Sequence, residues 1–162
     1  MSKPGSAVQR RTPDEHARRS AQTRLRSLFE RTTPNVFGSD GRITEAGLAA
    51  SNATLVDPPA VAIGLAGQGK TRGTAALVNT PVCTNQSIAL IKGRTGVLDT
   101  GYLFHNLDGR YDELRTRSAG GGRAGLSRGI LAKIPIALPD LPEQTRIAAA
   151  MDTLDETIAN IL

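Results

Sequence analysis

The sequence has no tryptophan, a single cysteine (Cys83) and an aromatic content of only 3%. One cysteine excludes an intramolecular disulfide and a cysteine cluster for metal, so we expect Cys83 to be a buried thiol. With so few aromatic residues, the core must consist mainly of valine, leucine, isoleucine and alanine. No apolar run approaches the ~20 residues of a membrane helix, and no secretory signal pattern is present. We therefore expect a cytoplasmic protein without a membrane partner.

The sequence also offers few residues for catalysis. The two histidines, His16 and His105, are far apart and belong to no ligand motif. None of the lysines follows an acidic residue at the spacing of a common nuclease core. The stretch DPPA at 57–60 has alanine where amino-methyltransferases carry the aromatic residue that stacks on a flipped base. The sequence thus predicts neither catalytic residues nor a metal site.

Positive charge is concentrated at the N-terminus. Residues 1–31 hold eight of the 20 basic residues and three of the 15 acidic ones, which leaves 12 of each in the remaining 131 residues. This basic arm either follows nucleic acid or is a solvated tail. Within it, the stretch T-P-D-E from Thr12 has the pattern of a helix start and predicts a helix over 13–30.

The middle of the chain predicts an α+β domain. Residues 32–42 are rich in turn formers and predict a linker or an exposed hairpin tip. A short helical turn is expected in 43–55 and a helix over 99–117, which Gly109 interrupts. Strands are expected at 60–65, 73–78, 87–91 and, ending at prolines, 130–139. The expected fold is a small mixed β-sheet with flanking helices.

The stretch GLAGQGKT, residues 64–71, matches the phosphate-binding loop pattern G-x-x-x-x-G-K-[ST]. Such a loop needs a helix directly after it, because the helix N-terminus supplies amides and a favourable dipole. Here a β-prone run follows Arg72 and Gly73, so the pattern predicts a bend between two strands. Nucleotide binding by Gly64–Thr71 is kept as an alternative function.

The last stretch predicts a long helix. Asp140 and Glu143 have the spacing of a capping box. Apolar residues then recur at alternating intervals of four and three, which is typical of a coiled-coil seam. The seam residues are Ile147, Met151, Leu154, Ile158 and Ile161. We expect them to contact another helix, and a protein that only captures a partner through this helix is a further alternative.

Several segments together resemble the specificity subunits of type I restriction-modification systems. The run LSRGILAKIPIALPDLPEQTRIAAAMDTLDETI resembles the end of a target recognition domain, where a basic glycine-rich loop leads through a Pro-Leu-x-E-Q junction to a long helix. Upstream, GQGKTRGTAAL and TNQSIALI resemble the middle strands of that domain, and GYLFHNL resembles its next helix. The resemblance divides the chain into the basic arm (1–31), a partial target recognition domain (32–140) and the start of a spacer or dimerisation helix (141–162).

The resemblance implies a DNA reader without catalytic activity. Its partners would be double-stranded DNA, modification (methyltransferase) subunits, a restriction subunit, and a second copy or half-specificity chain. S-adenosylmethionine, ATP and magnesium would be bound by partner subunits and not by this chain. The residues expected to contact DNA are Gln68, Lys70, Thr71, Arg72, Arg123, Ser127 and Arg128. Asn85 and Gln86 either contact DNA or, as we favour, satisfy buried backbone groups between strands.

Overall fold

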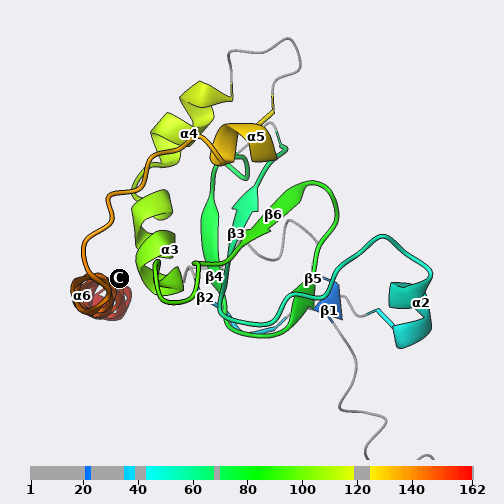
Figure 1. The fold of residues 1–162 in the computed structure, drawn as a ribbon, viewed down its shortest axis with the longest axis horizontal. Coiled ribbons are helices and arrows are strands. Elements are labelled where there is room, and N and C mark those ends of the chain that lie inside the picture. The colour runs from blue at the N-terminus through cyan, green and yellow to red at the C-terminus, as the bar shows by residue number, and fades with distance from the viewer. Residues whose placement is uncertain (1–20, 23–34, 39–42, 68–69, 119–124, 162) are drawn as a thin grey trace, which may run out of the picture.

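A four-stranded mixed sheet lies at the centre of the protein (Figure 1). The computed structural model describes residues 21–22, 35–38, 43–67, 70–118 and 125–161. The sheet order is β2-β4-β3-β6, in which β3 is antiparallel to both β4 and β6 and β2 is parallel to β4. The strands are β2 (Asn35–Val36), β3 (Ala60–Gly64), β4 (Ala75–Val78) and β6 (Ile88–Ile91). Two further short strands, β1 (Ala21–Gln22) and β5 (Val82–Cys83), form a parallel pair.

The central strand β3 is buried on both of its faces. All five of its residues are buried, because α-helices cover one face of the sheet and the chain around β5 covers the other. On the helix side, Val61 and Ile63 pack with Phe104 and Leu114. On the other side, Ala60 and Ala62 belong to a cluster that also contains Val82. This explains why the strand is a continuous apolar run and does not alternate.

The helices are arranged around the sheet. They are α2 (Glu45–Ala49), α3 (Thr100–Asp108), α4 (Tyr111–Arg117), α5 (Arg128–Leu131) and α6 (Leu141–Ile161). Figure 1 shows α3 and α4 along one side of the sheet, with α6 beyond α3. Asp99 caps α3 by accepting a hydrogen bond from the Tyr102 amide at 2.8 Å. None of the helices in the described part of the chain is long and apolar enough to cross a membrane.

Most of the predicted elements are confirmed. Strands are present within 60–65, 73–78 and 87–91, and a helix begins at Glu45. The helix expected over 99–117 is divided into α3 and α4 near Gly109. The capping box is present in part, since the Asp140 carboxylate accepts a hydrogen bond from the Glu143 amide at 2.9 Å. The α+β fold class is thus confirmed, including the long C-terminal helix.

Three predictions about secondary structure were wrong. Ala21 and Gln22, expected in a helix over 13–30, pair as a strand with β5; the rest of that segment lies outside the described residues. Within the expected linker 32–42, Val36 is only 1% exposed and pairs with β4. The strand expected over 130–139 is also absent from the structure.

The 130–139 segment instead begins in the short helix α5 and continues as irregular chain. Pro135 and Pro139 cannot donate backbone hydrogen bonds to a sheet. Side chains from the helices hold the segment in place. The Tyr102 hydroxyl donates to the Ala137 carbonyl at 3.0 Å, and the Arg110 guanidinium donates to the Pro135 carbonyl at 2.7 Å.

The start of α6 is anchored by the fully buried side chain of Gln144. Its amide nitrogen donates to the carbonyl oxygens of Val97 and Pro139, at 3.0 and 2.8 Å. Its amide oxygen accepts from the Asp99 backbone N–H at 2.8 Å. One side chain therefore joins three segments: the loop before α3, the approach to α6, and α6 itself.

Candidate functional site

The stretch GLAGQGKT connects β3 to β4, as the sequence predicted. The Gly64 amide donates to the Thr74 carbonyl at 3.1 Å, and the Gly73 amide donates to the Gly64 carbonyl at 2.9 Å. Residues 70–73 form a turn and β4 follows at Ala75, so no helix begins after Thr71. The predicted bend is confirmed, and the amides of a helix N-terminus are not available at this position for a nucleotide phosphate.

Helix α4 holds this turn in place. The Tyr111 hydroxyl donates to the Lys70 carbonyl at 3.1 Å, and the Arg115 guanidinium donates to the Tyr111 hydroxyl at 3.0 Å. Arg115 also donates to the Arg72 carbonyl at 3.4 Å. Gly73, at a φ of +86°, packs directly on Arg115. The backbone at Lys70 and Arg72 is therefore held by α4, while the Lys70 side chain remains exposed.

Helix α5 lies at the same end of the sheet (Figure 1). The chain before α5 joins the strand ends, because the Leu126 amide donates to the Leu65 carbonyl at 3.0 Å. The Ser127 hydroxyl accepts from the Ile130 amide at 3.2 Å and so caps α5. Arg128 is exposed on the first turn.

Residues 125–129 also spell G-x-S-x-G, the pattern of a hydrolase nucleophile elbow. That elbow requires a strand that leads directly into the serine, whereas residues 125–127 are irregular. Ser127 instead caps α5. The pattern therefore does not indicate a catalytic serine.

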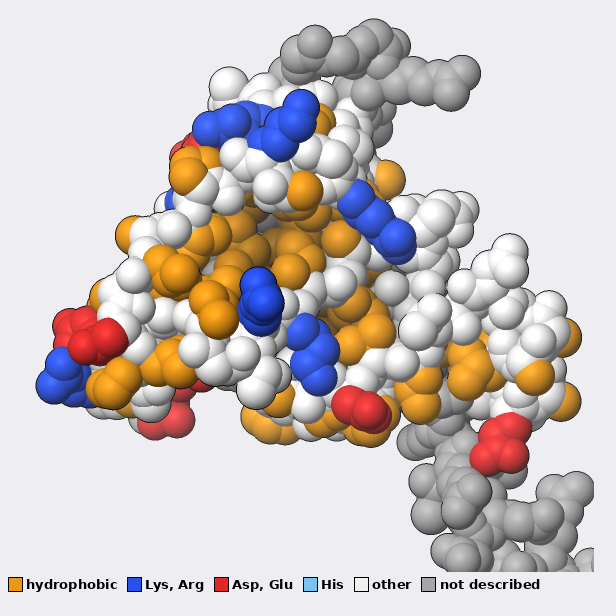
Figure 2. All heavy atoms as spheres, in the orientation of Figure 1, with side chains coloured by type: hydrophobic (Ala, Val, Ile, Leu, Met, Phe, Trp, Pro, Cys, Tyr) orange, Lys and Arg blue, Asp and Glu red, His pale blue; other side chains and the backbone are white. Residues whose placement is uncertain are grey.

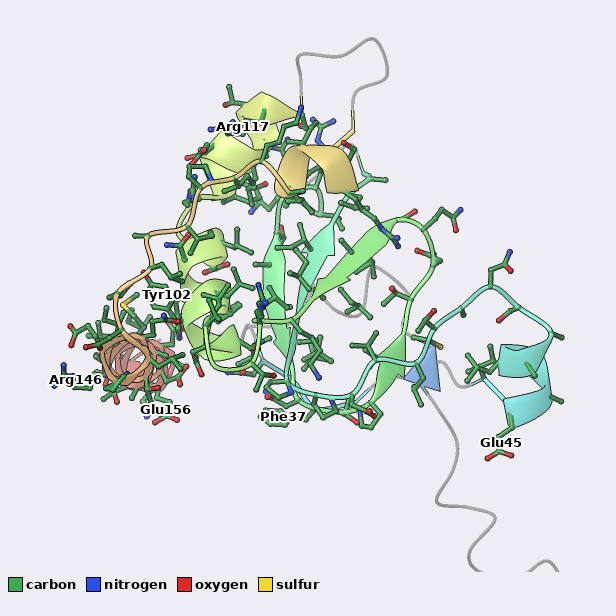
Figure 3. All side chains as sticks on the ribbon, in the orientation of Figure 1. Phe37, Glu45, Tyr102, Arg117, Arg146 and Glu156 are labelled. Atoms are coloured by element: carbon green, nitrogen blue, oxygen red, sulfur yellow. The ribbon has the colours of Figure 1, made fainter. Side chains whose placement is uncertain are left out.

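Arginine side chains enrich this end of the molecule in positive charge. Figure 2 shows Lys and Arg side chains gathered over α4 and α5, and Figure 3 places Arg117 at this end and Arg146 on α6. Glu113 bonds the Arg110 guanidinium at 2.6 Å and that of Arg117 at 2.7 Å. Hydrogen bonds from Arg110 and Arg117 lower the pKa of Glu113 to about 2. Glu113 thus stays ionised and offsets part of this positive charge.

The structure places five of the seven residues expected to contact DNA. Lys70, Thr71, Arg72, Ser127 and Arg128 lie at this end of the sheet, whereas Gln68 and Arg123 lie outside the described residues. Lys70 and Arg128 are exposed. Arg72 is half-buried, and its Nε atom is buried without a hydrogen-bond partner in the described structure. We refer to Lys70, Thr71, Arg72 and Arg128 as the basic end.

The structural role expected for Asn85 and Gln86 was wrong, because it required their side chains to be buried. Both side chains are exposed in the turn before β6, and the Asn85 side-chain oxygen accepts from the Ser87 amide at 3.0 Å. Asn85 therefore stabilises its own turn, as asparagine commonly does. Neither residue lies buried between strands.

A groove of about 890 Å³ lies beside β6. Three separate parts of the chain form it, so no local sequence pattern could have predicted it. We call it the β6 groove, and it is lined by Ser51, Asn52, Ala53, Thr54, Val56, Thr84, Asn85, Gln86, Ala89, Leu90, Ile91, Arg128, Leu131 and Ala132.

The described residues include no cluster of three or more histidine, cysteine, aspartate or glutamate side chains suited to a metal ion. Cys83 is buried, as expected, and burial raises the pKa of its thiol. A raised pKa leaves less of the reactive thiolate form, so Cys83 is a poor nucleophile.

Comparison with known proteins adds the following. The family model of the type I restriction modification DNA specificity domain matches residues 29–161. A chain from a structure on complex assembly and conformational transition of the type I R-M system is 19% identical, with a TM-score of 0.63, and the match covers 86% of this chain and 31% of that one. The HsdS subunit from Thermoanaerobacter tengcongensis is 24% identical, with a TM-score of 0.53, and the match covers 65% and 24%.

These two structures support the fold of the present chain. The chain spans only about a quarter to a third of the length of each of them. No curated protein sequence matches it.

Proposed function

Because the chain belongs to the type I restriction modification DNA specificity domain family, we propose that it binds double-stranded DNA through the basic end. The observation that carries this proposal is the turn between β3 and β4, where Tyr111 and Arg115 hold the backbone at Lys70 and Arg72 while the Lys70 side chain remains exposed. A cation whose own backbone is already held in place can meet a phosphate at a lower entropic cost. Phosphate contacts of this kind position a protein on the duplex.

Arg128 extends the basic end from the turn to α5. Arginine can contact either a phosphate or the edge of a guanine in the major groove. Gln68 and Arg123, which lie outside the described residues, remain predicted contacts. Ser127 accepts the capping hydrogen bond of α5, and its O–H group can still donate to a phosphate.

The chemistry belongs to partner subunits in this proposal. Modification subunits with S-adenosylmethionine would methylate adenine, and a restriction subunit with ATP and magnesium would cleave DNA. The present chain would supply recognition, with residues 32–140 as a partial target recognition domain and 141–162 as the start of the spacer helix. Residues 1–31, which are strongly basic, would add contacts with DNA that are independent of sequence.

The exposed seam of α6 supports a helix partner. Met151, Leu154, Ile158 and Ile161 are 38%, 54%, 55% and 77% exposed, in contrast to Gln144 and Ala148, which are buried. Apolar side chains repeated at coiled-coil spacing on an exposed face fit a second helix, supplied by another copy, a half-specificity chain or a modification subunit.

DNA binding is tested by measuring duplex affinity at several salt concentrations. Lys70→Ala should weaken binding to all duplexes and reduce the slope of log affinity against log salt by about one phosphate contact. Arg146→Ala is the matched control, because Arg146 is an exposed cation on α6, away from the basic end. A wild-type chain without duplex affinity at low salt, alone and with a modification subunit, would refute the proposal.

Two alternatives are separated by other measurements. Calorimetry with ATP and magnesium should detect no binding, whereas a nucleotide site at Gly64–Thr71 would give binding that Lys70→Ala abolishes. For the helix partner, Ile158→Glu should weaken association in sedimentation, and Asn160→Glu, an exposed position outside the seam, should not. Capture of a partner without any duplex affinity would favour a protein that acts only through α6.

A further inference from the structure

Strand β6 is an edge strand with an open side. Among the described strands it is the last in the order β2-β4-β3-β6 and pairs with β3 alone. The Leu65 amide donates to the Ser87 carbonyl, so in this antiparallel register Ser87, Ala89 and Ile91 direct their backbone groups toward β3. The backbone groups of Ile88 and Leu90 therefore point away from the sheet.

The outward groups of β6 are mostly without partners. The Ile88 amide makes one turn hydrogen bond, to the Asn85 carbonyl at 3.3 Å. The Ile88 carbonyl and both backbone groups of Leu90 have no hydrogen bond to any other part of the described chain. An open edge of this kind is a template for another strand, and proteins normally cover or disrupt it.

The β6 groove runs along this open edge and has two walls. One wall is the end of α5, with Arg128, Leu131 and Ala132, and the other is the segment 51–56. Ala89 and Ile91 belong to the sheet face that α5 covers, whereas Leu90 belongs to the opposite face, with Val56. A strand placed beside β6 would therefore have apolar surface above and below it.

We propose that the β6 groove is a strand-addition site, in which an extended segment of a partner polypeptide pairs with β6 as a fifth strand of the sheet. Backbone hydrogen bonds to Leu90 and to the Ile88 carbonyl supply affinity, and alternate side chains enter the two walls. Neighbouring strands lie about 4.8 Å apart, so the groove need accept only the width of one strand.

Charge defines the partner further. Among the described residues that line the groove, Arg128 is the one charged side chain and none is a carboxylate. The added segment therefore carries small or apolar side chains and one carboxylate on the side that faces α5. An unpaired strand edge suits a peptide backbone better than a duplex, because a duplex offers no row of amide donors to match it. This inference does not depend on DNA binding by the basic end.

The test uses the full chain and a short blocked peptide of alternating valine and threonine with one central glutamate. Nuclear magnetic resonance should show saturable shifts at 88–92, and amide exchange at Leu90 should slow by about tenfold or more at saturation. The same peptide with a central proline should not bind, since proline lacks the amide and interrupts an extended pair. A lysine in place of the glutamate should weaken binding, and Arg128→Glu should reverse that preference.

The outcomes are distinct. Absence of saturable binding by the glutamate peptide up to millimolar concentration, or binding that leaves Leu90 exchange unchanged, overturns the inference. Resonances of 88–92 that respond to a DNA duplex but not to the peptide would assign the groove to the DNA surface, and this also overturns it. Failure of duplex binding alone would refute only the function proposed for the basic end.

Discussion

The imidazole Nε2 of His105 lies 2.9 Å from Oδ1 of Asp152, and this contact joins α3 to α6. The His105 side chain is only 6% exposed, and its Nδ1 lies 4.0 Å from the Asp155 carboxylate. Asp152 follows Gln144 by about two helical turns. Helix α6 is therefore attached to the domain at two points, and its seam continues beyond the second one.

We expect His105→Ala to lower the free energy of unfolding by about 1–2 kcal/mol, because it removes a partly buried hydrogen bond and leaves a small cavity beside Phe104. His105 also affects a neighbouring carboxyl group. Burial and the Asp155 carboxylate raise the pKa of Asp108, and His105 offsets part of that rise. Urea unfolding measures the change, with the exposed Glu156→Ala as control. Equal stability of the two variants would contradict the attachment.

Gln144→Ala should lower the free energy of unfolding by about 2–4 kcal/mol, which is more than His105→Ala. The reason is that it leaves the Asp99 N–H and two carbonyls without their partner. Gln144→Glu should not rescue the loss. A carboxylate can still accept from Asp99, but it would place a buried charge against the carbonyls of Val97 and Pro139. The exposed Arg146→Ala serves as control for the same helix. Wild-type stability of Gln144→Glu would show that the network is unimportant.

Two glycines with positive φ allow the cost of backbone strain to be measured separately from the cost of close packing. Gly73 and Gly96 have φ of +86° and +77°, so alanine at either position costs about 1 kcal/mol in strain. A Cβ at Gly96 would meet nothing within 4 Å, whereas at Gly73 it would lie 3.3 Å from Arg115 Cγ and 3.4 Å from Leu114 Cβ. Thermal unfolding should show a larger loss for Gly73→Ala. Equal losses of stability for the two variants would mean that the close packing of Gly73 on α4 adds nothing to the cost of backbone strain.

The low pKa of Glu113 predicts that the protein loses stability in acid. Its pKa in the folded protein, about 2, is below that of an unfolded glutamate, roughly 4.3. Its contribution is therefore complete above the unfolded value and is lost as the pH falls toward 2. Glu113→Gln should flatten stability in this window compared with Glu156→Gln, an exposed glutamate on α6. Parallel pH profiles for the two variants would exclude a role for the Arg110–Glu113–Arg117 group.

The helices and strands that could be predicted are those whose sequence signals lie within a single short segment of the chain. The strand at 60–65 is a short apolar run, and the strand at 73–78 follows a glycine turn, so local composition was sufficient. Val36 is buried because it pairs with Val78, far away in the sequence, and nothing near it indicates a strand. In 130–139 the alternating apolar residues suggested a strand, but the prolines and the Ser127 cap favour a short helix and irregular chain.

The candidate site was predictable to the same degree. Lys70 and Arg72 lie on the bend that the glycine turn predicted. The clamp of that bend by Tyr111 and the β6 groove were not predictable, because each joins segments that only the fold brings together. Gln144 belongs to the E-Q junction that carries the resemblance, but only its complete burial identifies it as an anchor.

That anchor fixes the rotation of α6 about its own axis as well as its position. Successive residues of an α-helix are about 100° apart around the axis. One residue inserted after Ala148 would therefore turn the seam from Met151 to Ile161 to another side of the helix, while the domain and Gln144 stayed in place. Four inserted residues would return the seam nearly to its starting direction and move it about 6 Å along the helix axis. The direction in which a partner helix approaches is thus set by the two contacts that hold α6 to the domain, those of Gln144 and Asp152.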